Sequence, residues 1–177
     1  MQISRTMLFT LLLACGPALP AQQTCDTRSF PLSSPGARFH DNNDGTVSDT
    51  RSGLTWMRCS TGQTWVAQSC VGQAETHSLA SALDVANSVN QRGVFFYMDW
   101  RVPQIHELAS ITERQCENPR INLSEFPNTP AEFYWTLTAR PGAAEPASGY
   151  ALSFGAEGLR YENRADAHHV RLVRSGN

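Results

Sequence analysis

The amino-acid sequence predicts an α+β fold with two helices and several short strands. Two segments, 77–92 and the one that follows Pro103, carry apolar residues at helical spacing, and short alternating strand patterns lie before and after them. A chain of 177 residues is long enough for one domain with its own core and short for two. We therefore expect a single domain over residues 38–174.

Residues 1–21 have the features of a secretory signal peptide. Arg5 supplies the positive start, and the apolar run at 7–14 is shorter than the roughly 20 residues of a membrane span. Cleavage after Ala21 would release a soluble chain. In the alternative, the segment that ends at Cys15 resembles a lipoprotein box, and a lipid on Cys15 would anchor the protein. We expect a periplasmic or secreted protein without a membrane span, with an outer-membrane lipoprotein as the alternative.

Residues 22–37 are rich in Ser, Thr and Pro and are predicted to be an extended lead-in held only at Cys25. The ordered domain is expected to begin with a β-hairpin over 38–49, because its central turn contains an Asp-Gly pair. Segment 54–58 has the alternation of a half-buried strand and is predicted to follow the hairpin.

The hairpin turn also matches part of an EF-hand calcium loop. Asn42 and Asp44 would fill the third and fifth positions, but the first would be His40 and the twelfth Arg51. Neither is an anionic oxygen ligand, and no helical pattern flanks the turn. We therefore expect a simple β-turn and no metal site.

The segment 77–92 is predicted to be an amphipathic helix. Its apolar residues form one stripe, and Gly93 suits the position just after a helix end. The stripe consists of Leu79, Ala82, Leu83, Ala86 and Val89.

A strand that passes through a proline into a second helix is predicted at 99–111. Trp100 and Val102 can point to one side of a strand, and Pro103 suits the first turn of a helix. Glu107 would lie near the positive end of the helix dipole. The helix would bury a stripe formed by Ile105, Leu108 and Ile111.

Three strands are predicted to end the chain, at 133–138, 150–154 and 169–173. The Pro-, Gly- and Ala-rich segment 139–149 between the first two is too long for a tight hairpin, and loops of this kind often carry binding residues. A polar run that reaches Asp166 is predicted to be a loop between the last two strands.

The cysteines indicate disulfide bonds. Without Cys15, four remain, and four cysteines allow three pairings. Cys59 and Cys70 enclose ten residues and form the favoured local pair, which leaves Cys25 with Cys116. No Cys-x-x-Cys pair or zinc-type Cys–His spacing is present, so a zinc site or a catalytic thiol is not expected.

The charge excludes an obvious nucleic-acid partner. Removal of residues 1–21 takes away Arg5 alone, which leaves 13 basic and 16 acidic residues and a net charge of −3. All basic residues are arginines. Codon bias explains this most simply, although Arg also suits sulfate, carboxylate or phosphate groups.

Several sequence blocks, taken in their order, resemble the Lcl C-terminal domain family of secreted bacterial proteins. The blocks are the hairpin 38–49, Gly53-Leu54-Thr55-Trp56-Met57-Arg58-Cys59, Gly62-Gln63-Thr64-Trp65 with Cys70, Asp99-Trp100-Arg101-Val102-Pro103 with Glu107-Leu108, Ile121-Asn122 with Phe126-Pro127, Tyr134-Trp135-Thr136 and Val170-Arg171-Leu172-Val173-Arg174.

The resemblance implies a C-type-lectin-like fold in which two helices flank small antiparallel sheets, with a long irregular loop region and chain ends close together. Lectins of this fold that bind sugar through calcium use a Glu-Pro-Asn or Gln-Pro-Asp tripeptide and a later Trp-Asn-Asp. This chain has Glu117-Asn118-Pro119 in a different order and no Trp-Asn-Asp. Calcium-dependent sugar binding is therefore not expected.

We expect a non-catalytic, calcium-independent recognition module that binds a glycan or an envelope or extracellular protein through its long loops, without a cofactor. The candidate ligand-binding residues lie in or after the loop 139–149, where polar and aromatic side chains gather: Arg140, Glu145, Tyr150, Arg160, Tyr161, Arg164, His168 and Arg171. The alternative function is that of a periplasmic partner or inhibitor protein.

A third hypothesis is an enzyme related to sulfatase-modifying proteins, which the block Trp100–Pro103 loosely resembles. His106 and Glu107 are neighbours on a predicted helix and point about 100° apart, so they cannot converge on one substrate atom. No Ser–His–Asp order and no Gly-rich phosphate loop is present. We therefore expect no catalytic residues.

Overall fold

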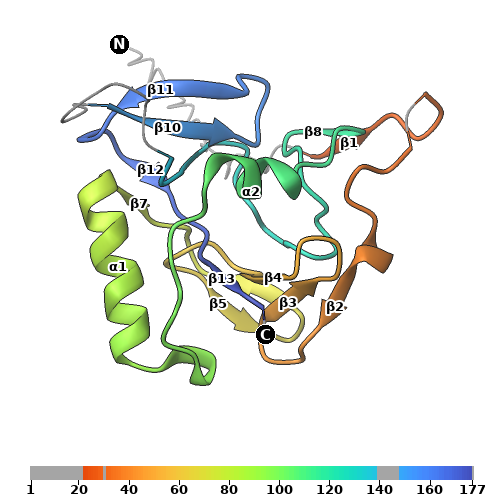
Figure 1. The fold of residues 1–177 in the computed structure, drawn as a ribbon. Coiled ribbons are helices and arrows are strands. Elements are labelled where there is room, and N and C mark those ends of the chain that lie inside the picture. Colours follow the sequence, from red (N-terminus) through yellow and green to blue (C-terminus); the bar gives the residue numbers. More distant parts are fainter. Residues whose placement is uncertain (1–21, 30, 139–147, 177) are drawn as a thin grey trace, which may run out of the picture.

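The computed structural model of the protein describes residues 22–29, 31–138 and 148–176, and in these residues short strands form four sheets, with two α-helices packed beside them (Figure 1). The predicted α+β class is therefore confirmed. The first half of the chain supplies β1 (Thr24–Cys25), β2 (Phe39–Asp41), β3 (Thr46–Asp49), β4 (Leu54–Met57), β5 (Thr64–Val66), β6 (Ser69–Val71), β7 (Thr76–His77) and α1 (Leu79–Gln91). The second half supplies α2 (Ile105–Ser110), β8 (Cys116–Glu117), β9 (Phe133–Trp135), β10 (Ser148–Ser153), β11 (Leu159–Asn163), β12 (His168–His169) and β13 (Val173–Ser175).

The predicted N-terminal hairpin is present and forms half of a four-stranded antiparallel sheet of order β13-β4-β3-β2. Phe39 lies opposite Asp49, and Val173 of the last strand lies opposite Trp56. Beside the hairpin, the short 3-10 helix Gly36–Arg38 directs the Arg38 guanidinium into an ion pair with buried Asp49. The first and last strands of the ordered domain thus belong to one sheet.

The second large sheet has five strands in the order β11-β10-β9-β12-β7. Three of its four pairings are antiparallel, whereas β12 runs parallel to β9, with His169 opposite Tyr134. β11 was not expected, because its residues are mostly exposed. An edge strand gains its backbone hydrogen bonds from one neighbour alone and needs no apolar alternation.

The predicted strand 169–173 is divided between the two sheets, which corrects the expectation of one strand. His168–His169 joins the five-stranded sheet as β12, and Val173–Ser175 joins the four-stranded sheet as β13. The residues between them connect the sheets and are buried on all sides: Val170, Arg171 and Leu172 have no exposed surface.

Helix α1 follows the predicted stripe and begins two residues later than expected. The Ser78 hydroxyl caps its start by accepting the N–H of Ser81 at 3.2 Å, and His77 belongs to strand β7 instead. Gly93 follows the helix with φ of 59°, in the left-handed region that favours glycine. Of the described helices, none combines the length and apolar character that crossing a bilayer requires.

The segment 99–111, predicted to be a strand followed by a helix that contains Pro103, differs from the prediction in two respects. Trp100 and Val102 are buried, but the only strand-like pairing here is a bridge between Arg101 and Val173 within the described residues. Pro103 lies before α2 and not in its first turn. The helix is capped by Gln104, whose backbone N–H donates to the Glu107 carboxylate at 2.6 Å.

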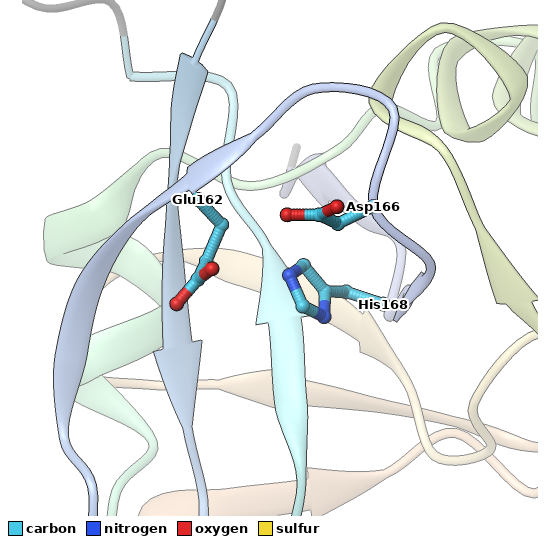
Figure 2. Close-up of side chains that lie close together, drawn as sticks. All are labelled: Glu162, Asp166 and His168. Carbon is cyan, nitrogen blue, oxygen red and sulfur yellow. The ribbon is translucent and has the colours of Figure 1, made fainter.

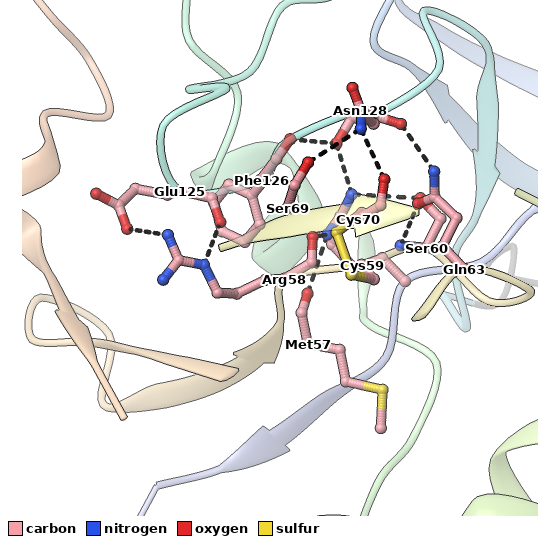
Figure 3. The surroundings of a disulfide bond; sticks show 12 residues. Met57, Arg58, Cys59, Ser60, Gln63, Ser69, Cys70, Glu125, Phe126 and Asn128 are labelled. Carbon is pink, nitrogen blue, oxygen red and sulfur yellow. Dashed lines mark hydrogen bonds and ion pairs between the residues drawn. A yellow bond between two sulfur atoms is a disulfide. The ribbon is translucent and has the colours of Figure 1, made fainter. Parts of the chain in front are cut away.

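Both predicted disulfides are present, Cys59–Cys70 and Cys25–Cys116. The first joins the end of β4 to the β5–β6 hairpin (Figure 3). Asn128 also binds this hairpin: its side-chain amide donates to the Cys70 carbonyl at 2.6 Å. Arg58 donates to the carbonyls of Ser124 and Glu125 at 2.8 and 2.9 Å.

The lead-in 22–37 is attached at more places than Cys25, so that expectation was wrong. The Gln23 amide donates to two backbone carbonyls at 2.6 and 2.7 Å. Further along, the buried Glu113 carboxylate accepts the N–H groups of Ser33 and Ser34 at 3.1 and 2.8 Å. A buried carboxylate needs such donors, and here the lead-in supplies them.

Candidate functional site

The structure distributes the eight candidate ligand-binding residues among different surroundings. Arg140 and Glu145 lie in residues 139–147, outside the described residues, as does most of the predicted binding loop. Arg171 is buried in the core. The remaining five lie on or beside β10, β11 and β12: Tyr150, Arg160, Tyr161, Arg164 and His168.

Two of these five form an aromatic pair on one face of the five-stranded sheet. Tyr150 lies opposite Tyr161 in the β10–β11 ladder, with ring centroids 5.0 Å apart. Neighbouring residues of a strand point to opposite faces, so Arg160 lies on the other face, where its guanidinium is 5.4 Å from the Phe133 ring centroid. The predicted aromatic and basic residues therefore do not form one site.

Arg171 is a structural residue, and its prediction as a ligand-binding residue was wrong. Its guanidinium donates to the carbonyls of Met57 and Arg58 and, at 2.7 Å, to the Thr129 hydroxyl. It also lies 4.9 Å from the ring centroid of Phe126. With no exposed surface, the side chain cannot meet a ligand; it joins segments far apart in the sequence.

His168 lines a surface cleft of about 870 Å³ between β7, β12 and the segment before β9. We call it the histidine cleft and define it by Glu75, His77, Glu132, Phe133, His168 and His169. The β7–β12 pairing brings it together, because it places His168 opposite His77. The Glu75 and Glu132 side chains are exposed at its surface.

Burial disfavours the charged form of two histidines of the cleft. Burial lowers the pKa of His168, although the nearby carboxylates of Glu162, Asp166 and Glu132 act in the opposite direction. Burial likewise lowers the pKa of His169, whose Nδ1 lies 2.9 Å from the Glu75 carbonyl oxygen. At neutral pH both imidazoles can therefore accept a hydrogen bond or bind a metal ion.

A second, less polar cleft of about 590 Å³ lies between α1 and the β5–β6 hairpin. Residues that line it include Gln63, Trp65, Arg92 and Phe95. Trp65 packs closely on Gly45, and the Arg58 guanidinium lies 4.5 Å from the Trp65 ring centroid. Sequence reasoning did not select Trp65. A tryptophan in a short hairpin closed by a disulfide was the signal that could have indicated it.

Three metal-ligating side chains converge beside the histidine cleft (Figure 2). One donor atom from each of Glu162, Asp166 and His168 lies within 4.8 Å of the others. Only His168 was among the predicted residues. The two carboxylates were missed because they lie in the polar run that was predicted to be a loop, whereas Glu162 belongs to β11 and Asp166 to the turn that leads into β12.

One serine–histidine–carboxylate group bears on the enzyme hypothesis. His77 Nδ1 lies 3.3 Å from the Ser81 hydroxyl, and its Nε2 lies 3.6 Å from a Glu75 carboxylate oxygen. Both distances exceed those of a well-formed catalytic hydrogen bond. Ser81 does not line the histidine cleft, so a substrate there would not meet its hydroxyl.

Comparison with known proteins identifies the family. The sequence model of the Lcl C-terminal domain matches residues 45–174, from the turn before β3 into β13. No curated protein matches the chain. The matched segment contains the two α-helices, both large sheets except β2 and the end of β13, and every residue that defines the histidine cleft. The chain therefore belongs to the Lcl C-terminal domain family.

Proposed function

We propose that the protein is an exported, non-catalytic recognition domain that binds a glycan in the histidine cleft. The observation that carries the proposal is the composition of the cleft wall. Exposed carboxylates of Glu75 and Glu132 line the cleft together with Phe133, and so do His168 and His169, whose pKa values burial lowers. A sugar can donate its hydroxyl groups to these acceptors and pack its C–H groups on the Phe133 ring, so the cleft offers partners for both kinds of group.

The setting of the cleft supports a recognition role. Fixed polar groups bind with less loss of entropy than mobile ones. The cleft wall is fixed by strand pairing, by the Cys59–Cys70 disulfide nearby and by Arg171, which ties the chain beside β12 to the end of β4. The proposal includes calcium independence, so chelation of calcium should leave glycan binding unchanged.

A glycan array followed by titration calorimetry tests the proposal. The variant Glu75→Gln/Glu132→Gln removes two negative charges from the cleft and should weaken binding of the best glycan at least tenfold. Asp84→Asn/Glu117→Gln is the matched control, since it removes the same charge from exposed residues elsewhere. The proposal fails if no glycan binds saturably, or if both double variants lose affinity equally.

A protein partner is the second candidate, and one observation favours it. Phe96 and Met98 expose 99% and 76% of their surface close together in the chain, and Phe95 and Phe96 both have positive φ. Exposed apolar side chains that lie close together suit a protein interface. A stoichiometric envelope partner that is lost with Phe96→Ser/Met98→Ser, while Val66→Ser retains it, would favour this function over glycan binding.

We also propose a periplasmic or secreted location and a C-type-lectin-like relationship. Two disulfides fit an oxidising compartment, and residues 1–21 have the pattern of an export signal. Mass spectrometry of the mature N-terminus distinguishes cleavage before Gln22 from acylation at Cys15. The lectin-like relationship is supported by the two helices and by the shared sheet of β2 and β13.

A further inference from the structure

We propose that Glu162, Asp166 and His168 form a binding site for a divalent transition-metal ion of the zinc class. The site stands on one geometric fact: single donor atoms from the three side chains lie within 4.8 Å of one another. Figure 2 shows both carboxylates on the same side of the imidazole, with one ring nitrogen turned toward them. The site does not depend on glycan binding.

The chain restricts the side chains of His168 and Asp166 and leaves room for that of Glu162. The His168 ring packs against Trp135, with centroids 4.7 Å apart, so its orientation is restricted. Glu162 lies opposite Gly149 in the β10–β11 ladder, and glycine has no side chain to occupy the space in front of it. Asp166 is fixed by its Oδ2, which accepts the Asn163 N–H at 3.0 Å.

A buried nitrogen that lacks a partner points to a missing ligand. Among the described residues, His168 Nε2 is shielded from solvent and has no hydrogen-bond partner. The carboxylates of Glu162 and Asp166 are close to His168, yet within the same set of residues neither donates to nor accepts a hydrogen bond from this nitrogen. An unsatisfied buried polar atom is costly, and a bound cation would satisfy it while neutralising the two carboxylates.

The donor set selects the kind of ion. One imidazole nitrogen with two carboxylate oxygens suits Zn²⁺, whereas Ca²⁺ prefers six to eight oxygen ligands and Mg²⁺ keeps its waters. Donors about 2.0–2.2 Å from a tetrahedral Zn²⁺ lie about 3.4 Å apart, so the side chains must close in slightly. Asp166 keeps one oxygen on the Asn163 N–H, so the movement falls mainly to the side chains of Glu162 and His168.

Three protein ligands leave one position of a tetrahedral ion for water or another ligand. His168 also lines the histidine cleft, so the ion would lie at one end of that cleft. Zinc binding at Glu162, Asp166 and His168 would also link β11 to β12, because its ligands come from both strands and the turn between them.

Zinc titration of the purified, oxidised and chelator-treated protein tests the site. Calorimetry with ZnCl₂ should give one saturable ion per chain, and the unfolding temperature should rise with zinc concentration. Each of Glu162→Gln, Asp166→Asn and His168→Gln should weaken binding at least tenfold. Asp166→Asn retains an oxygen that can accept the Asn163 N–H, so the turn can still form.

Two control variants and one competing outcome keep the test decisive. His40→Gln and Asp84→Asn change exposed residues elsewhere and should leave zinc affinity unchanged. Binding lost with His168→Gln but kept in both carboxylate variants would overturn the three-ligand site, as would the absence of saturable binding. Failure of glycan binding has no bearing on this result, because the titration contains no glycan.

Discussion

Glu107 and Arg101 form a two-pronged ion pair, with Nη1 to Oε2 at 2.7 Å and Nη2 to Oε1 at 2.6 Å. The same carboxylate caps α2 through the Gln104 N–H. The backbone of Arg101 exchanges both hydrogen bonds with Val173, at 2.9 and 3.0 Å. One carboxylate thus connects the start of α2 to the last strand of the domain.

This arrangement predicts a pH dependence of stability. Burial alone would raise the pKa of Glu107, but the hydrogen bonds from Arg101 and Gln104 outweigh it, and the net shift lowers the pKa. Protonation therefore favours the unfolded chain, so the stabilisation is complete above the ordinary carboxyl pKa of about 4.3 and is lost as the pH falls through the lower folded value.

Glu107→Gln should lower the free energy of unfolding by about 1–3 kcal/mol at pH 7, because a charge-assisted pair and a helix cap are both weakened. The gap to the unaltered protein should narrow below about pH 4.3. Denaturant unfolding of both proteins at pH 7, 5, 4 and 3 measures the gap above and below this pH. A gap that stays constant over this range would contradict the assigned role of the carboxylate.

Arg171 is expected to be essential for folding and not for ligand contact. Arg171→Met should lower the free energy of unfolding by about 3 kcal/mol or more, because buried carbonyl and hydroxyl oxygens lose their donor. Arg160→Met, which removes an exposed arginine from β11, should change it by about 0.5 kcal/mol or less. Unaltered unfolding of Arg171→Met would contradict the structural role.

Alanine substitution of Gly45 and Gly53 distinguishes the cost of backbone strain from that of steric clash. Both have positive φ, at 96° and 71°, but a Cβ on Gly45 would lie 2.9 Å from Trp65 Cγ, whereas one on Gly53 would meet nothing within 4 Å. Gly53→Ala should therefore cost about 1 kcal/mol of stability, and Gly45→Ala about 1–3 kcal/mol more. Thermal unfolding gives the comparison, and equal losses would show that Trp65 moves away freely.

The two disulfides should stabilise the protein to different extents. They span 91 and 11 residues, and the chain-entropy model assigns about 4–5 kcal/mol to the long loop and about 3 kcal/mol to the short one. Cys25→Ser/Cys116→Ser should therefore be less stable than Cys59→Ser/Cys70→Ser. Denaturant unfolding ranks the variants, and peptide mapping of the unaltered protein should recover both linked pairs.

Features with a local signal were predicted from the sequence. The apolar stripe of α1 and its terminal Gly93 depend on residues a few positions apart, and the structure has both. The hairpin of β2 and β3 formed around its Asp-Gly turn for the same reason. The disulfide pairing could be deduced because one loop was short and only two cysteines remained.

Features that depend on distant residues could not be predicted in this way. The segment 168–175 crosses from one sheet to the other, and nothing in its local pattern marks where β12 ends and β13 begins. Arg171 looked like a surface arginine because its partners, the carbonyls of Met57 and Arg58, are more than 100 residues away. Pro103 lies outside α2 because the residue that caps the helix is Gln104, whose N–H donates to the Glu107 carboxylate.

By itself the sequence determined the α+β class, the main helix, the disulfide pairs and the family, because apolar periodicity, turn residues and cysteine number act over short stretches or the whole chain. The tertiary structure alone decided which polar side chains meet. His168 meets Glu162 and Asp166 because the chain turns back after β11, through Asp166, and returns as β12, with β10 and β9 between these two strands in the sheet. Such a meeting depends on strand order, and strand order is set by packing between segments that no local pattern connects.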